Sequence, residues 1–177
     1  MSALTRTPQN PNILHPNKYQ LHFSRNPALQ YFCQSVIVPG LSVGEIAKPT
    51  PFVETYSPGD KIIYDILNIT FLIDEELVAW KEIHDWIRGM GFPTNFSEYA
   101  NLPNIGRPYY NPQQPQFSSA SLTLLSSANL PLYNIKFVDI FPISISSFIM
   151  SSTESPNQPI TADAAFRYSW YDIEKLF

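Results

Sequence analysis

The chain has a single cysteine, Cys33, among 177 residues. One thiol cannot form an internal disulfide or a thiolate metal cluster. Cys33 lies in the apolar run Tyr31–Val36, where a buried and unreactive thiol is expected. The sequence also has no apolar signal-peptide core at its N-terminus and no run of about 18 apolar residues, so it predicts a soluble protein made in a reducing cytoplasm, with no membrane-spanning segment.

Charged residues are also few. They make up 15% of the chain, and the formal net charge is −4. A protein that binds nucleic acid electrostatically needs a basic face that displaces counterions from the phosphates. No run of Lys or Arg suggests such a face, so the composition argues against electrostatic nucleic-acid binding.

Glycine and histidine are too sparse for the common catalytic and phosphate-binding motifs. Six scattered glycines cannot build a glycine-rich phosphate loop. His15, His22 and His84 lie far apart, and no pair has the spacing of metal ligands. The acidic triplet Asp74–Glu76 is explained by a helix start, where the helix dipole favours negative charge. We therefore expect no catalytic residue, no metal or cofactor site, and a protein that is not an enzyme.

Proline and aromatic residues are abundant instead: the chain has 17 prolines, 12 phenylalanines and 10 tyrosines. Together with many β-branched residues, they indicate numerous strands joined by proline-containing loops. We expect residues 1–16 to form an extended N-terminal arm, because prolines interrupt any helix there. Residues 17–177 are expected to form one domain with a proline-rich loop at 94–117, and a loop of that length is usually functional or covered by a partner.

The clearest local pattern is a strand followed directly by a helix. Within residues 61–73, apolar side chains alternate with polar ones, which predicts a strand. Asp74 follows the strand, and its carboxylate can accept from the first N–H groups of a helix. Residues 74–90 then repeat apolar side chains every three or four positions, as an amphipathic helix does. We expect three of them to pack the helix on the sheet: Trp80, Ile83 and Ile87.

Further strands are predicted where polar and apolar residues alternate. They are residues 19–23, 29–38, 118–126, 132–140 and 161–171. Asn26–Pro27 is expected to turn the first two strands into an opening hairpin, and Phe141–Pro142 to form another turn. Roughly seven to nine strands with one helix predict a mainly β (α+β) fold, an antiparallel β-sandwich or barrel with one packed α-helix.

Residues 41–56 are strand-like but interrupted by Pro49 and Pro51, which predicts an edge strand or a projecting hairpin. An edge strand exposes unpaired N–H and C=O groups, and native proteins cover or pair them. Two neighbouring subunits can share such an edge, and a heterologous contact repeated by rotation closes into a ring. We therefore expect Val43 and Val53 to lie on an inter-subunit edge.

One order of elements runs through residues 17–174. An opening strand pair ends in Val38-Pro39-Gly40-Leu41, and the proline-rich excursion 49–58 follows. The unit Asn68–Glu76 then runs into a helix that contains Ile83-His84-Asp85-Trp86-Ile87, and residues 135–145 precede the closing strand. This order resembles the tail-tube protein family of contractile-tailed bacteriophages.

The resemblance implies a virion structural protein. It implies stacked hexameric rings in which strands from each subunit join a continuous β-barrel around a lumen, through which DNA passes without sequence-specific binding. The negative net charge fits such a conduit, since phosphate contacts would hold the duplex in place. Sheath, baseplate or neck proteins are the implied partners, and the implied location is the virion tail after synthesis in the bacterial host cytoplasm.

Two alternatives remain open. A tail terminator (completion) ring or a baseplate tube-initiator ring would have the same fold. A carbohydrate-binding β-sandwich would instead use exposed aromatic side chains, for which Tyr109, Tyr110 and Tyr171 are the candidates.

Overall fold

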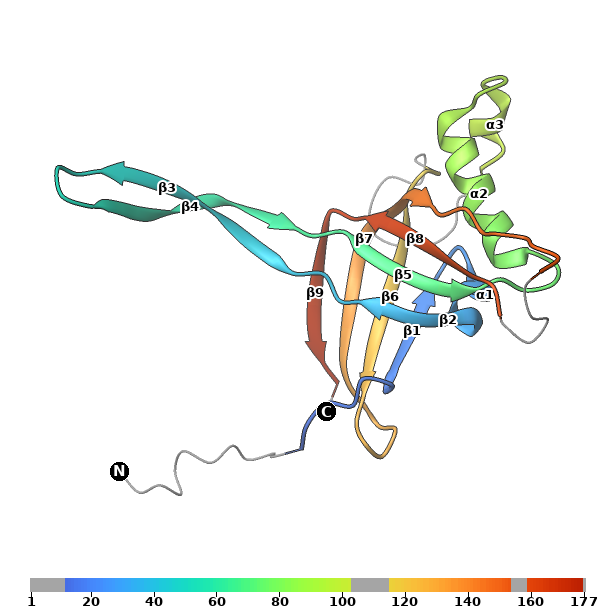
Figure 1. Ribbon diagram of the computed structural model, residues 1–177, viewed down its shortest axis with the longest axis horizontal. Helices are drawn as coiled ribbons and strands as arrows, with labels where there is room; N and C mark the ends of the chain where they lie inside the picture. Colours follow the sequence, from blue (N-terminus) through green and yellow to red (C-terminus); the bar gives the residue numbers. More distant parts are fainter. Residues whose placement is uncertain (1–11, 103–114, 154–158, 177) are drawn as a thin grey trace.

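The computed structural model describes residues 12–102, 115–153 and 159–176. A curved sheet forms the body, two helices lie at its upper right, and a long hairpin projects to the left (Figure 1). The elements are β1 (Tyr19–Phe23), α1 (Pro27–Phe32), β2 (Cys33–Ile37), β3 (Leu41–Pro49), β4 (Glu54–Tyr64), β5 (Leu67–Leu72), α2 (Val78–Gly91), α3 (Ser97–Ala100), β6 (Ser118–Leu125), β7 (Pro131–Ile145), β8 (Thr161–Arg167) and β9 (Trp170–Lys175).

The main sheet has seven strands, and every pairing in it is antiparallel. Its order is β1-β6-β7-β8-β5-β2, with β9 paired to β7 as well. The long strand β7 joins the two halves, because its first part pairs with β6 and β9 and its last part with β8. Within the described residues β1 and β2 do not pair with each other, so the sheet is not closed into a barrel. The predicted mainly β, antiparallel fold is confirmed, and the closed barrel is not seen.

The core is built from side chains of the sheet strands β1, β5, β6, β7 and β8 and of the helices α1 and α2. In β5 the alternation predicted from the sequence holds, because Leu67, Ile69 and Phe71 are at most 1% exposed. Ile69 lies opposite Ala164 on β8, and Phe71 lies opposite Ala162. Small alanines on β8 leave room for the larger side chains of β5, as interdigitating core packing requires.

The helix α2 begins at Val78, four residues after its predicted start, although Asp74 does accept from its first N–H groups as predicted. One carboxylate oxygen of Asp74 accepts from the Val78 N–H at 2.9 Å and the other from the Ala79 N–H at 3.4 Å. These bonds satisfy first-turn donors that a helix leaves unpaired. Leu77 lies between Asp74 and Val78 in the sequence and has a left-handed backbone with φ 56°.

The predicted opening hairpin is wrong. β1 pairs with β6, and β2 pairs with β5. The segment between them contains the short helix α1, which begins at Pro27 and is capped by the Asn26 side chain accepting from the Leu29 N–H at 2.9 Å. Proline is favoured in the first turn of a helix, and asparagine at its N-cap. The Asn-Pro pair therefore starts a helix here instead of a turn.

Three further boundaries differ from the prediction. The expected strand 61–73 is divided between β4 and β5, because the chain leaves the projecting hairpin and enters the main sheet at residues 65–66. The closing strand 161–171 is divided between β8 and β9. Phe141–Pro142 is no turn, since β7 continues through it with a register shift between Pro142 and Ser144. A bulge is one of the few places where a strand accepts proline.

Candidate functional site: a projecting apolar hairpin

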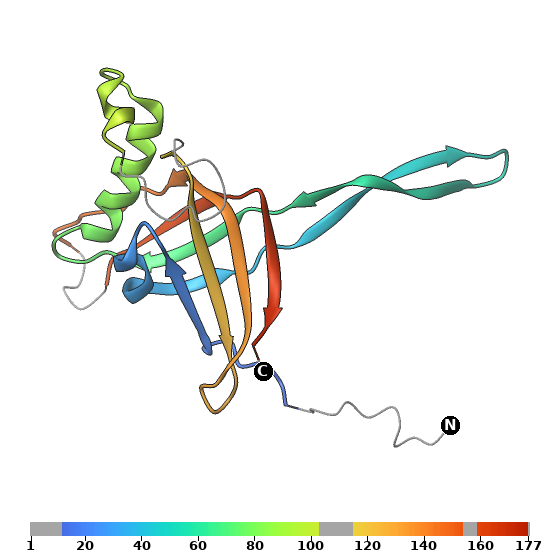
Figure 2. The ribbon, with the colours of Figure 1, turned by 180° about the vertical axis from the view of Figure 1, so that it is seen from behind.

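The strands β3 and β4 form a two-stranded hairpin that extends away from the sheet (Figures 1 and 2). Among the described residues each of the two strands pairs only with the other. Every residue of β3 is exposed. An isolated two-stranded hairpin is at best marginally stable in water. This hairpin therefore has the form of an element that needs a partner surface.

The hairpin carries many large apolar side chains for a surface element. Those of β3, β4 and the connecting turn that are more than half exposed are Leu41 54%, Val43 52%, Ile46 56%, Phe52 99%, Val53 62%, Tyr56 58%, Ile62 54% and Ile63 55%. Directly opposite residues of an antiparallel pair share a face, so Val43 and Ile62 form one apolar pair and Leu41 and Tyr64 another. Contiguous exposed apolar residues of this kind mark interaction surfaces.

The hairpin contains a bulge at its centre. Val43 pairs with Ile62 and Glu45 with Pro58. Between these two pairs the chain advances two residues along β3 and four residues along β4. The strands approach closely at this point, because a Cβ placed on Gly59 would lie 2.7 Å from the Gly44 carbonyl oxygen. Glycine is therefore required at position 59. Bulges bend and twist a strand pair, and this one sets the direction of the outer half of the hairpin.

The root of the hairpin is fixed to the body by aromatic side chains. Tyr64, the last residue of β4, makes edge-on contacts with the rings of Tyr168 and Tyr171 at 5.9 and 5.3 Å. The Tyr168 hydroxyl donates to the Asp65 carbonyl at 2.8 Å. Burial is the main cause that raises the pKa of Tyr168 to about 12. A desolvated and hydrogen-bonded root holds the projecting hairpin at a defined angle to the sheet.

Both residues predicted for the inter-subunit edge lie on this hairpin. Val43 is within β3. Val53 precedes β4 and lies in the connecting turn, where its N–H donates to Thr50 Oγ1 at 3.2 Å and not to the opposite strand. Residues 41–56 thus belong to a projecting hairpin, the second of the two forms that the prolines allowed. Whether Val43 and Val53 contact a neighbour stays a prediction.

The three residues predicted to pack the helix differ in their burial. Ile83 is 1% exposed and belongs to the core, whereas Trp80 and Ile87 are partly buried at its border. The buried face of α2 also includes Trp86, whose indole N–H donates to the Gln116 carbonyl at 2.9 Å. The sequence pattern missed Trp86 because two helical stripes share Ile83. The predicted stripe also contains Trp80 and Ile87, which lie at the border of the core, whereas the buried stripe contains Trp86.

The tyrosines proposed as sugar platforms give no such site in the described structure. Tyr109 and Tyr110 lie outside the described residues. Tyr171 packs among Tyr64, Phe137 and Tyr168, and its hydroxyl donates to the Pro39 carbonyl at 3.4 Å. A ring held in this way stabilises the hairpin root.

The parts of the chain that the structure describes contain no group of three or more His, Cys, Asp or Glu placed to hold a metal ion. Across those parts, no helix combines the length and hydropathy needed to span a membrane.

The model of the phage tail tube protein family matches residues 8–174. The chain belongs to this family. A curated relative of this protein is the tail tube terminator protein of Enterobacteria phage T4, which is 23% identical over 158 residues, with 87% of this chain and 83% of the relative covered.

Solved structures share the fold of this protein at low sequence identity. The tube-terminating cap of the anti-feeding prophage has a TM-score of 0.66 at 11% identity, with 99% of both chains covered. A chain of the sheath–tube complex of the PVC extracellular contractile injection system has a TM-score of 0.62 at 12% identity, also over 99% of both chains. The sheath/tube terminator of that system has a TM-score of 0.59 at 11% identity, over 92% of this chain and 97% of the other.

These findings confirm the predicted family and its structural, non-enzymatic role. The protein is a structural protein of the phage tail tube family.

Proposed function

We propose that copies of this tail tube protein close into a hexameric ring around a lumen, and that the ring stands at the end of a tail tube. The hairpin carries this proposal. It projects one apolar surface away from the body, and such a surface on each copy can meet a different surface of the next copy. A heterologous contact of this kind repeats by rotation until it closes.

The position at the tube end is supported by the relative from phage T4, a tail tube terminator protein matched over most of both chains. A repeating tube subunit is the second candidate, favoured by the similarity to a chain of a sheath–tube complex. The two differ in assembly. A terminator forms single rings that do not stack on themselves, and a repeating subunit polymerises into tubes.

The lumen in this proposal conducts DNA without binding it. The formal net charge of −4 supports a conduit that repels phosphates and does not trap them. Sheath, baseplate or neck proteins would contact the outside and ends of the ring, which would be assembled in the bacterial host cytoplasm.

A substitution on the hairpin tests the proposal. Val43→Asp places a charge on the exposed apolar pair Val43–Ile62, whereas Val43→Thr keeps a β-branched side chain of similar shape at the same position. Sedimentation velocity should give rings for the native protein and for Val43→Thr, and monomers for Val43→Asp. Because Val43 is 52% exposed, the free energy of urea unfolding should change by less than about 1 kcal/mol in both variants when each protein is measured as a dilute monomer, so that association does not contribute. Rings that persist in Val43→Asp would exclude the hairpin as the ring contact.

A further inference from the structure

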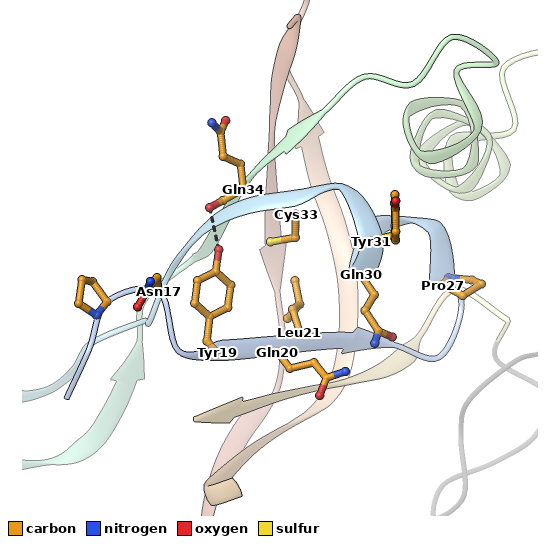
Figure 3. Close-up of a pocket in the computed structure, with 10 residues that line it drawn as sticks. Asn17, Tyr19, Gln20, Leu21, Pro27, Gln30, Tyr31, Cys33 and Gln34 are labelled. Carbon is orange, nitrogen blue, oxygen red and sulfur yellow. Dashed lines mark hydrogen bonds between the residues drawn. The ribbon is translucent and has the colours of Figure 1, made fainter. Parts of the chain in front are cut away.

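The open end of the sheet forms a groove of about 660 Å³ between β1 and β2 (Figure 3). The strands at its two sides are the terminal strands of the sheet path, and in the described part of the chain β1 pairs only with β6 and β2 only with β5. Each strand therefore presents one backbone edge to the groove. Unpaired strand edges are templates for the addition of another strand.

The distance across the groove is larger than one strand spacing. The Tyr19 side chain points from β1 to β2, and its hydroxyl donates to the Gln34 carbonyl at 2.7 Å (Figure 3). Paired strands lie about 4.8 Å apart, whereas these two are separated by the length of a tyrosine side chain. Tyr19 thus forms the floor of the groove without pairing the two strands. Burial raises the pKa of Tyr19 to about 12, which agrees with a desolvated floor.

The lining of the groove has a distinct chemistry. Its described residues include no Asp, Glu, Lys, Arg or His, and its polar side chains are amides and tyrosines, among them Gln20, Gln30, Gln34 and Tyr31. Amides both donate and accept hydrogen bonds. This lining suits the backbone of an extended, nearly uncharged peptide, and offers no cation for a phosphate or other anion.

The chain itself contains a candidate peptide before the described residues begin, and Arg6 is the one charged side chain among residues 1–11. Eleven residues precede Asn12, and an extended segment of that length reaches at most about 40 Å. Between Met1 and Pro8, the six residues Ser2–Thr7 are free of proline and include the β-branched Thr5 and Thr7. The strands β1 and β2 each have five residues, so the lengths match.

The path of the chain favours the groove of another copy. Asn12–His15 lie beside Leu124, Leu132 and Tyr133, at the ends of β6 and β7. In the sheet, β6 is on the side of β1 away from β2. Pro16 and Asn17, just before β1, still line the groove, so on going back toward Asn12 the chain leads away from its own groove. An arm that continues in this direction extends toward a neighbouring copy.

We propose that residues Ser2–Thr7 of one subunit lie as an added strand in the β1–β2 groove of a second copy. The proposal rests on the ring described above, and adds a contact distinct from the hairpin. Each subunit then donates one arm and accepts one, so every groove in a closed ring is filled.

Cysteine cross-linking tests this in the full chain. In a Cys33→Ser background, one population carries Leu4→Cys and a second, distinguished by a mass tag, carries Gln34→Cys. The matched control replaces Gln34→Cys with Ser127→Cys, an exposed position near the exit of the arm. Thiols docked together meet at an effective concentration in the millimolar range, so oxidation should give at least ~10-fold more mixed dimer with Gln34→Cys than with Ser127→Cys. The excess should persist in 1 M salt because the described lining carries no charge.

Electron microscopy of the same samples separates this proposal from the ring. Rings with equal cross-linking at Gln34→Cys and Ser127→Cys overturn the arm contact and leave the ring standing. Excess mixed dimers without rings support the arm contact and contradict the ring. A protein with both Leu4→Cys and Gln34→Cys provides the last check. If it cross-links within single chains and forms no mixed dimers, the arm fills its own groove and the second-copy assignment is wrong.

Discussion

Replacing Trp86 with alanine should destabilise the protein more than the same change at Trp80. Trp86 is 2% exposed, packs 6.4 Å from the Phe166 ring, and lies under the Arg25 guanidinium at 4.7 Å. Emptying a buried tryptophan site costs about 3–5 kcal/mol. Trp80 is only partly buried and packs on His84 and Phe148 at the border of the core. Full burial of a large apolar side chain contributes about 1.5–3 kcal/mol, so its partial burial predicts a cost of about 1–2 kcal/mol.

The assay is urea unfolding followed by tryptophan fluorescence and circular dichroism. Both variants should be made in the Val43→Asp background, so that association does not add to the measured stability. Trp86→Phe serves as a control, because it keeps most of the apolar volume and removes the donor to the Gln116 carbonyl, for about 1–3 kcal/mol. A Trp80→Ala loss equal to or larger than the Trp86→Ala loss would refute the assigned orientation of α2.

Two other changes test the hairpin and its root. Gly59→Ala forces the backbone apart at the bulge, since the new Cβ would lie 2.7 Å from the Gly44 carbonyl oxygen. Amide hydrogen exchange should become faster throughout β3 and β4, and ring formation should weaken. Exchange in β5 and β8 should stay unchanged. The stability of the native protein should fall as the pH rises from about 10 to about 12, because the pKa of Tyr168 is raised to about 12 in the folded state and its neutral phenol is favoured there. Tyr168→Phe should lower stability by about 1 kcal/mol at neutral pH, through loss of the bond to Asp65, and should reduce this alkaline loss; an unchanged pH profile would contradict the role of Tyr168.

The elements whose signals are local were predictable from the sequence. Alternation in β5 reports burial of Leu67, Ile69 and Phe71 on one face, and that pattern depends on nothing distant in the chain. Asp74 before an amphipathic segment predicted α2 and its first hydrogen bonds, although the helix starts at Val78. Two prolines at residues 49 and 51 predicted an edge strand or a projecting hairpin, and the structure has the hairpin.

The pairing of strands was not predictable in the same way. Alternation shows which face of β1 is buried, but any antiparallel partner satisfies it, and the structure pairs β1 with β6 almost a hundred residues further on. Pro142 looked like a turn because a proline in a strand is tolerated only at edges and bulges, and a bulge cannot be seen without the partner strand β8. Asn26–Pro27 did carry a readable local signal, an N-cap followed by proline, but the same pair also begins turns.

The candidate site was also predictable only where its signal is local. The sequence located the hairpin, while its exposed pairs, such as Val43 with Ile62, depend on a register that the bulge alters. The β1–β2 groove had no sequence signal. It exists because β1 and β2, the two end strands of the sheet path, do not pair with each other in the described structure, and strand order cannot be read from local patterns.

The ring itself is tested most directly by cryo-electron microscopy of the purified native protein. The account predicts closed rings of six copies that remain single, with the hairpin of each copy lying on its neighbour. Particles that stay monomeric at micromolar concentration, or rings in which the hairpins of all copies point into solvent, would contradict it.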